Sequence, residues 1–469
     1  MQALYSVAEI VAATGGRPVN CGDGDVTAVS IDSRDIPPGG LFVAIKGDRF
    51  DGHDFVAKAI AAGATAALVS ENKAEDLKDL PLIVVPDALE GLVALARFAR
   101  ERSHARIIAV TGSAGKTSTK DALAAICAAE GKTHAAIKSF NNHWGVPLTL
   151  ARMPADAVYG IFEIGMNHAG EISPLVQLVR PEAVVITAIA PAHIAYLGSL
   201  DAIARAKAEI FDGLVPGGVA FVNADHGQLD IIRSVADKKG ISRFVTYGYA
   251  DNADVRLISV GRGDTGLNGQ LSGPDIDVRL ETSFAGRHHL ANVAGAVLAA
   301  QAVGIAPQNA ARSVSSLREG DGRGAITQLG DGSKPLTLVD ESFNANPASM
   351  RAALEVFADL PAPPGKKILV LGDMLELGEV AQSMHEELAD AVIAAGADSI
   401  YLVGPQMRYL TEKLVEMPVT AHAETTGELQ NTVLAALDYG DLVMVKGSKG
   451  IGLAPLVNEI RSRFGGTVK

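Results

Sequence analysis

Apolar runs alternate with helical segments along most of the chain. Runs such as residues 107–110 and 183–189 have the length and apolar content of buried strands. Segments such as 88–103 and 200–211 carry apolar residues at helical spacing, which predicts helices with one buried face. Strands that alternate with helices build mostly parallel sheets covered by helices on both faces. The pattern therefore predicts an α/β fold.

The alternation divides into three units. The first predicts a small α/β domain, with helices at 6–13 and 54–62 and strands at 26–32, 41–45, 66–69 and 82–85. The second predicts strands at 159–164, 183–189 and 218–223, helices at 171–178 and 200–211, and antiparallel strands in the polar stretch 250–285. The third follows the glycine cluster 320–324 and predicts strands at 336–340, 367–371, 399–403 and 441–446. We expect domains at 1–85, 86–322 and 323–469, the last a doubly wound unit with a ligand crevice at its strand ends.

Composition narrows the class of protein. The chain of 469 residues is 48% apolar and 20% charged, as in soluble globular proteins. Its formal net charge of −13 argues against nucleic acid as a partner, because phosphate contacts need a basic surface. Two cysteines are too few for a disulfide framework, and neither a signal peptide nor an apolar run of membrane-span length is apparent. We expect a cytoplasmic protein without a membrane span.

The segment 110–119, Val-Thr-Gly-Ser-Ala-Gly-Lys-Thr-Ser-Thr, stands between an apolar run and a helical segment. A strand, a glycine-rich loop and a helix in this order let backbone N–H groups enclose an oligophosphate. Lys116 can then reach the terminal phosphates, and the Thr117 hydroxyl can hold Mg²⁺. The first glycine of the common pattern is replaced by Val110, and Gly112 lies inside the loop. The segment predicts a nucleoside triphosphate site; a glycine turn without a ligand is the alternative.

Polar side chains follow two further predicted strands. Glu163 lies near the end of strand 159–164, and His193 follows strand 183–189. Both suit a Mg²⁺ site beside the phosphate loop, although an ordinary buried-edge glutamate and a structural histidine would give the same pattern. Lys207 lies in an amphipathic segment, and its pattern alone favours a solvated helix lysine.

Three other polar segments have two interpretations each. Asn292, in a loop that opens the helix 293–303, is either a helix cap or a nucleotide contact. Asp340 ends a strand, and the segment 341–347 after it suits a ligand loop as well as a helix N-terminus. The turn 446–450, Lys-Gly-Ser-Lys-Gly, suits a carboxylate or phosphate, or is a plain surface turn.

Ten motifs extend over nearly the whole chain. They are SIDSRDIPPGGLFVAIKGDRFDGHDF (30–55), TGSAGKTSTK (111–120), NNHWGVPLTL (141–150), EIGMNHAGEI (163–172), APAHIAYLGS (190–199), ARAKAEIF (204–211), GRHHLANVAGA (286–296), DESFNANPASM (340–350), LGDMLELG (371–378) and VKGSKG (445–450). In this order they resemble the Mur ligase family of peptidoglycan synthesis.

The resemblance implies a fold and an activity. The fold is a UDP-substrate domain, a central ATPase domain and a Rossmann-like C-terminal domain. The activity is ATP- and Mg²⁺-dependent amide formation through an acyl phosphate. The segment 340–347 favours the members that join D-alanyl-D-alanine to a UDP-N-acetylmuramoyl-tripeptide. We also expect a monomer. A ligase that adds the third amino acid, a folylpolyglutamate synthase and a nucleotide-gated switch protein are the alternatives.

The resemblance also implies roles for individual residues. Lys116, Lys207 and His193 are the implied catalytic residues, with Lys207 carbamylated, and Thr117, Glu163, His193 and Lys207 the implied metal site. The implied nucleotide contacts are Gly112, Ser113, Ala114, Gly115, Lys116, Thr117, Ser118, Asn292, Arg323, Asp340, Asn344 and Asn346. The implied substrate contacts are Ser33, Arg34, Asp51, Gly52, His53, Asn141, Asn142, Lys446, Ser448 and Lys449. The family pattern is broken at two places: the pair His143-Trp144 replaces a smaller aliphatic pair, and Lys449 stands where the family often has an arginine after Lys-Gly-Ser.

Overall fold

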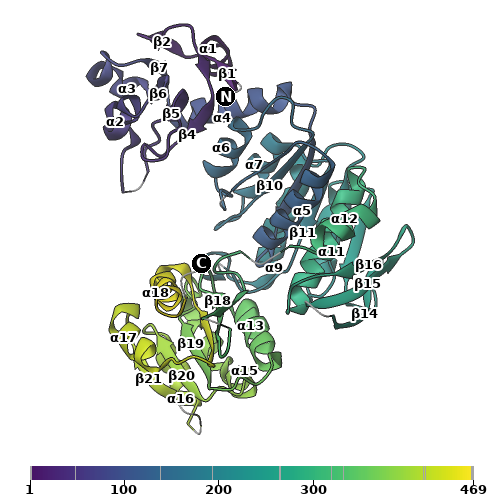
Figure 1. The fold of residues 1–469 in the computed structure, drawn as a ribbon. Helices are drawn as coiled ribbons and strands as arrows, with labels where there is room; N and C mark the ends of the chain where they lie inside the picture. The colour runs from purple at the N-terminus through teal and green to yellow at the C-terminus, as the bar shows by residue number, and fades with distance from the viewer. Residues whose placement is uncertain are drawn as a thin grey trace.

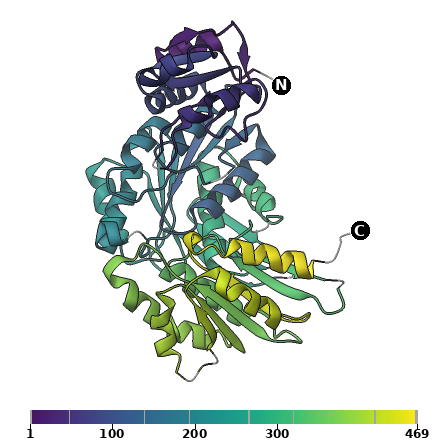
Figure 2. The ribbon, with the colours of Figure 1, turned by 90° about the vertical axis from the view of Figure 1, so that its left-hand side faces the viewer.

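Three lobes follow one another along the chain in the computed structural model, which describes residues 3–47, 49–137, 139–192, 194–263, 266–317, 320–330, 332–415, 417 and 419–465 (Figure 1). Figure 2 shows the lobes one above another, with the N-terminal lobe at the top. Each lobe is built on its own sheet, so the mixed α/β fold with mostly parallel sheets is confirmed.

The N-terminal lobe contains a five-stranded sheet. Its order is β2 (Arg17–Val19), β7 (Leu82–Val85), β6 (Ala66–Ser70), β5 (Gly40–Val43) and β4 (Ala28–Ser30), all parallel except β2. Helices α1 (Val7–Thr14), α2 (Val56–Ala61) and α3 (Glu71–Ala74) complete the lobe. The predicted strand 26–32 is interrupted at Thr27, because β3 (Asp25–Val26) pairs instead with β1 (Tyr5–Ser6).

The central lobe is built on a nine-stranded sheet. Its order is β16 (Ile276–Glu281), β15 (Leu267–Gly273), β14 (Val255–Arg262), β13 (Phe244–Gly248), β12 (Val219–Asn223), β11 (Ala183–Ile186), β8 (Arg106–Thr111), β10 (Tyr159–Glu163) and β9 (Thr133–Ala135). The strands are parallel from β9 to β14, and β15 and β16 add the predicted antiparallel edge. Strand β8 lies between β10 and β11, which places the phosphate loop at a topological switch point.

Helices cover both faces of the central sheet. On one face, α5 (Lys116–Glu130), α11 (Arg287–Ala302) and α12 (Pro307–Val314) pack against Ile108 and Val110 of β8. On the other face, α6 (Gly145–Ala151), α7 (Ile172–Val179) and α9 (Leu200–Lys207) pack against Ile107 and Ala109. Alternate residues of β8 therefore pack into the cores on opposite faces of the sheet, and for this reason the strand is apolar at successive positions.

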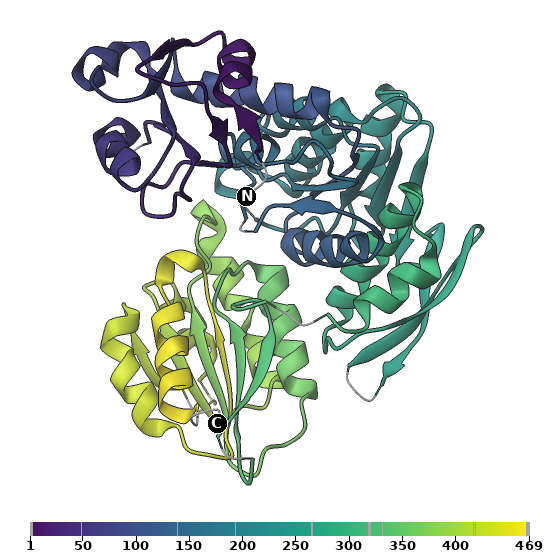
Figure 3. The same cartoon turned by 45° about the horizontal axis from the view of Figure 1, so that its top comes forward.

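The C-terminal lobe contains a six-stranded sheet. Its order is β17 (Ala325–Leu329), β18 (Leu336–Glu341), β22 (Leu442–Lys446), β19 (Lys367–Gly372), β20 (Ser399–Val403) and β21 (Val419–Ala423), with only β17 antiparallel among the described strands. Helices α13 (Pro347–Asp359), α15 (Ala389–Ala394) and α16 (Met407–Lys413) pack on one face, and α17 (Thr426–Ala436) and α18 (Ala454–Phe464) on the other. In Figure 3 this lobe lies at the lower left, with the N-terminal lobe at the upper left and the central lobe on the right.

Two predicted elements differ from the structure in ways that matter for the site. Helix α11 begins at Arg287, so the loop predicted before residue 293 is helical. Helix α9 ends at Lys207, and the rest of the predicted helix 200–211 is the 3-10 helix η3 (Ala208–Gly213). No helix among the described residues is long and apolar enough to cross a membrane.

Candidate active site

The phosphate loop joins β8 to α5 and is held from the neighbouring strand β11. The Ser113 N–H donates to the Ala188 carbonyl at 2.7 Å, and the Thr187 hydroxyl donates to the Thr111 and Ala114 carbonyls. A Cβ at Gly112 would overlap Thr187, and a Cβ at Gly115 would overlap Asn292. Both glycines have positive φ (154° and 83°), so the loop conformation needs glycine at these positions.

Lys116 begins α5 and folds back over this loop. Its Nζ donates to the Gly112 carbonyl at 2.8 Å. Burial lowers the pKa of Lys116; the Glu163 carboxylate opposes this effect and the Arg323 guanidinium adds to it. The buried Ser113 Oγ has no hydrogen-bond partner among the described residues, although buried hydroxyls are usually paired. An ammonium group and an unpaired hydroxyl in a loop of backbone N–H groups fit a triphosphate ligand.

Glu163 ends β10 and is 2% exposed. Thr117 Oγ1 donates to Glu163 Oε2 at 2.7 Å, and Asn141 Nδ2 donates to Glu163 Oε1 at 2.6 Å. Hydroxyl and carboxylate oxygens are the donors that Mg²⁺ prefers, so Thr117 and Glu163 fit this ion. The described part of the chain contains no group of three or more His, Cys, Asp or Glu side chains that could hold a metal, and His193 lies outside the described residues.

Lys207 is buried, contrary to the solvated lysine that its helical pattern predicts. Its side chain is 1% exposed at the end of α9. Burial sets the pKa of Lys207 well below its ordinary value, and the nearby charge of Lys116 lowers it further. No ion pair joins it to any carboxylate that the structure describes. Burial and the Lys116 charge thus both favour the neutral form of this amine over the ammonium form.

Arg323 connects the C-terminal lobe to the rim of the phosphate loop. Its guanidinium donates to Ser139 Oγ at 3.1 Å, and Ser139 Oγ lies 3.4 Å from Thr117 Oγ1. Burial lowers the pKa of Arg323, while the carboxylates of Glu163, Asp121 and Glu341 act in the opposite direction. The Arg323 guanidinium therefore interacts electrostatically with Glu163, the carboxylate that is the candidate Mg²⁺ ligand.

Asp340 is 2% exposed, and both of its carboxylate oxygens are occupied by protein donors. Oδ2 accepts the Gly322 N–H and the Arg461 guanidinium, each at 3.0 Å. Oδ1 accepts the Ser342 N–H at 3.2 Å and the Ser342 hydroxyl at 2.7 Å. Asp340 therefore ties the linker 320–324 to strand β18 and helix α18.

The three asparagines implied as nucleotide contacts have different surroundings. Asn292 lies in the second turn of α11 and packs against Gly115, so it is not a helix cap. Asn346 caps α13: its Oδ1 accepts the Ser349 N–H at 2.9 Å. The Asn344 side chain is exposed, and its carbonyl accepts Lys446 Nζ at 3.2 Å. Of the three, only Asn292 is placed against the phosphate loop by a described contact.

The turn after β22 is fixed by internal contacts. Lys446 is 1% exposed and pairs with Glu341 Oε2 at 3.0 Å. Ser448 Oγ accepts the Leu375 N–H at 2.9 Å and donates to the Ala345 carbonyl at 3.3 Å. Lys449 is exposed, which leaves it as the cation of this turn available to a ligand.

The N-terminal candidates lie at the carboxyl ends of β4 and β5. His53 Nε2 accepts the Ser70 N–H at 3.0 Å, so its Nδ1 carries the proton and donates to Asp51 Oδ1 at 2.6 Å. A Cβ at Gly52 would lie 2.6 Å from the Ile45 carbonyl oxygen, which requires glycine there. Arg34 is exposed and forms a two-point contact with Asp32, while Ser33 is buried.

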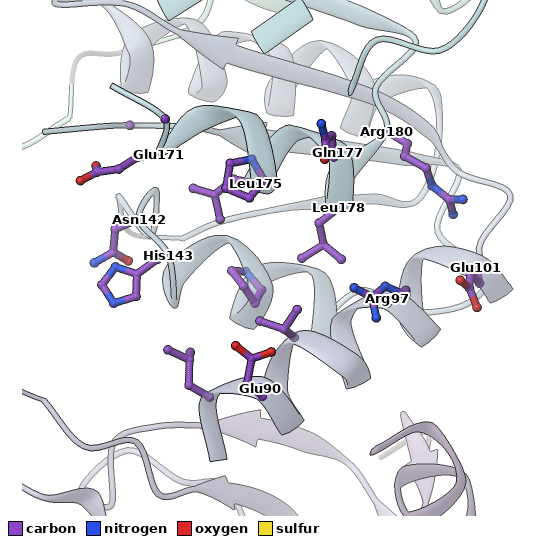
Figure 4. Close-up of a pocket in the computed structure, with 16 residues that line it drawn as sticks. Glu90, Arg97, Glu101, Asn142, His143, Glu171, Leu175, Gln177, Leu178 and Arg180 are labelled. Carbon is purple, nitrogen blue, oxygen red and sulfur yellow. The ribbon is translucent and has the colours of Figure 1, made fainter. Parts of the chain in front are cut away.

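A cavity of about 770 Å³ opens between α4 (Ala88–Arg102) and α7. Figure 4 shows Asn142, His143 and Glu171 at one end of it and Arg97, Arg180 and Glu101 at the other. Asn142 Oδ1 accepts the Gly145 N–H, at the first residue of α6, at 2.9 Å. The cavity therefore reaches Asn142, the neighbour of the Asn141 that donates to Glu163.

Sequence reasoning missed Ser139, Thr187 and Arg461. Ser139 and Thr187 are hydroxyl residues that lie just before recognised motifs in the sequence, and this proximity along the chain was the available signal. Arg461 contacts Asp321 and Asp340 across more than 100 residues, and nothing in its helical pattern indicates these partners.

The chain matches three family models. They are the "Mur ligase family, catalytic domain" over residues 25–128, the "Mur ligase middle domain" over 110–300 and the "Mur ligase, glutamate ligase domain" over 327–449. The UDP-N-acetylmuramoyl-tripeptide–D-alanyl-D-alanine ligase of Rickettsia prowazekii is 34% identical over 443 residues, 94% of this chain and 95% of that protein. The ligase of the same name from Escherichia coli K12 is 36% identical over 93% of this chain and 94% of its own length.

Solved structures of MurF ligases have the same fold as this chain. MurF from Acinetobacter baumannii superposes with a TM-score of 0.84 at 28% identity, over 98% of this chain and 100% of that chain. MurF ligase from Thermotoga maritima, solved in complex with ADP, has a TM-score of 0.77 at 22% identity over 93% and 97% of the two chains, a shared fold.

Proposed function

Because the chain belongs to the Mur ligase family, we propose that it joins D-alanyl-D-alanine to UDP-N-acetylmuramoyl-tripeptide in peptidoglycan precursor synthesis. Ligases of that name are similar to it over nearly its full length. The observation that carries the proposal is the cluster of Lys116 with the buried Thr117, Glu163 and Lys207 beside one phosphate loop. ATP is the energy source, and Mg²⁺ the proposed metal.

The reaction must bring two anions together. The terminal carboxylate of the tripeptide attacks the γ-phosphate of ATP and gives an acyl phosphate and ADP; the amine of D-alanyl-D-alanine then displaces phosphate and forms the amide. Lys116 places positive charge at the terminal phosphates, and Arg323 adds a second cation from the C-terminal side. Bound Mg²⁺ would supply further positive charge, held by Thr117, Glu163, His193 and a carbamate on Lys207. Burial supports the carbamate, because only a neutral lysine amine reacts with CO₂.

The remaining residues divide between the substrates. We assign Gly112, Ser113, Ala114, Gly115, Ser118 and Asn292 to ATP, together with Asn344 and Asn346. Ser33, Arg34 and the turn 51–53 are assigned to the UDP group, and Asn141 and Asn142 to the muramoyl group. Lys446, Ser448 and Lys449 are assigned to the dipeptide side. We further propose domains at 1–85, 86–322 and 323–469, a monomer, and a cytoplasmic location.

The assay that tests the function supplies purified protein with Mg²⁺-ATP, UDP-N-acetylmuramoyl-tripeptide and D-alanyl-D-alanine. Phosphate release should require the tripeptide and the dipeptide together, and mass spectrometry should detect the new amide. The matched control replaces the dipeptide with its N-acetylated form, which lacks the attacking amine. ATP hydrolysis at the same rate with and without the dipeptide, and without amide formation, would contradict the proposed ligase activity. That result would favour a nucleotide-gated switch protein.

A further inference from the structure

Phe343 lies where the linker, strand β18 and the turn after β22 come together. Its N–H donates to the Gly322 carbonyl at 3.0 Å. A Cβ at Gly322 would lie 2.9 Å from Phe343 Cβ, and Gly322 has a φ of 75°, so the linker passes closely over this residue. The backbone of Phe343 is therefore held in place by the same linker that carries Arg323.

Two cations from different segments lie against the ring of Phe343. The Arg323 guanidinium carbon is 4.1 Å from the ring centroid, and Lys449 Nζ is 5.4 Å from it. Both distances are within the range in which an aromatic ring attracts a cation. One half-buried side chain thus contacts two positive groups that come from different segments of the chain.

The two cations face different parts of the proposed reaction. Arg323 donates to Ser139 at the rim of the phosphate loop and lies in the field of Glu163. Lys449 follows Ser448, whose hydroxyl is tied to Leu375 and Ala345. The ring is therefore the shared contact between a cation on the phosphate side and a cation on the acceptor side.

We propose that Phe343 is a positioning residue that aligns Arg323 with the phosphate and Lys449 with the carboxylate of the acceptor. This inference rests on the proposed ligase function. The ring acts through Arg323 and Lys449, by fixing the spacing of these two cations. Lysine carries its charge on a flexible four-carbon stem, so a contact with the ring restricts where the Lys449 ammonium can lie.

Phe343→Leu tests the proposal, because leucine keeps an apolar side chain and removes the aromatic ring. The KM for ATP and the KM for D-alanyl-D-alanine should each rise about five- to tenfold. The KM for UDP-N-acetylmuramoyl-tripeptide should stay unchanged, since its UDP contacts are in another lobe. Phe343→Tyr keeps the ring and should restore both KM values. Tyr409→Leu, which removes the ring beside Arg408 in the same lobe, is the control for a cation–ring contact away from the site.

A double-mutant cycle separates positioning from general damage. If Lys449 acts through the ring, Phe343→Leu combined with Lys449→Met should raise the KM for the dipeptide by less than the product of the single effects. A lower kcat with all three KM values unchanged, or multiplicative effects in the cycle, would overturn the inference. Absence of amide formation by the wild-type protein would instead reject the proposed function.

Discussion

Lys207→Ala is expected to lower kcat by about a thousandfold, because it removes the group proposed to carry a carboxylate into the metal site. The structure places this side chain out of water, next to Lys116 and without a described carboxylate partner. Burial lowers the pKa of Lys207 and so favours the neutral amine, which is the form that can make a carbamate with CO₂. Initial rates of amide formation at saturating substrate measure the effect.

Short carboxylates distinguish the carbamate from other roles of Lys207. Alanine leaves a space in which formate or acetate can replace the missing carboxylate, so both should restore part of the activity. Lys207→Met is the matched control, because methionine fills this space and should be inactive with or without the additives. Wild-type enzyme in ¹³C-bicarbonate should also show a carbamate resonance that both variants lack. Full activity of Lys207→Ala would contradict the assignment.

The phosphate loop and Glu163 were predictable because their signals are local. A strand, two glycines and a helix follow one another in sequence, and Glu163 ends the strand that pairs with β8. Parallel strands bring such ends to one edge of a sheet. The proximity of Thr117 and Glu163 is thus a direct consequence of topology.

Lys207 and Asn292 show where local patterns fail. The helical pattern assigns a lysine to the solvent, but α9 gives way to η3 at this point, and Lys207 enters the core. The polar segment before residue 293 predicts a loop, yet Arg287 already begins α11 and Asn292 packs on Gly115. Tertiary packing determines both the burial of Lys207 and the helical conformation at Asn292. The local sequence pattern near a helix end does not reveal this packing.

Asp340→Ala is expected to destabilise the C-terminal lobe by about 3 kcal/mol. The substitution leaves the Gly322 N–H, both donors of Ser342 and the Arg461 guanidinium without their shared acceptor. Global denaturation of a protein with three lobes is not a two-state process. Hydrogen exchange measured by mass spectrometry on peptides from β18 and α18 reports the stability of this lobe directly.

Asp321→Ala is the matched control, since Asp321 is the other carboxylate partner of Arg461. Its side chain is 85% exposed, so its loss should cost less than about 1 kcal/mol and leave exchange in β18 nearly unchanged. The comparison separates a buried anchor from a direct nucleotide contact, the role that family resemblance implies for Asp340. Because all four described donors to Asp340 belong to the protein, we expect faster exchange in β18 and α18 even without nucleotide. Unchanged exchange with a large increase in the KM for ATP would show instead that Asp340 contacts the nucleotide.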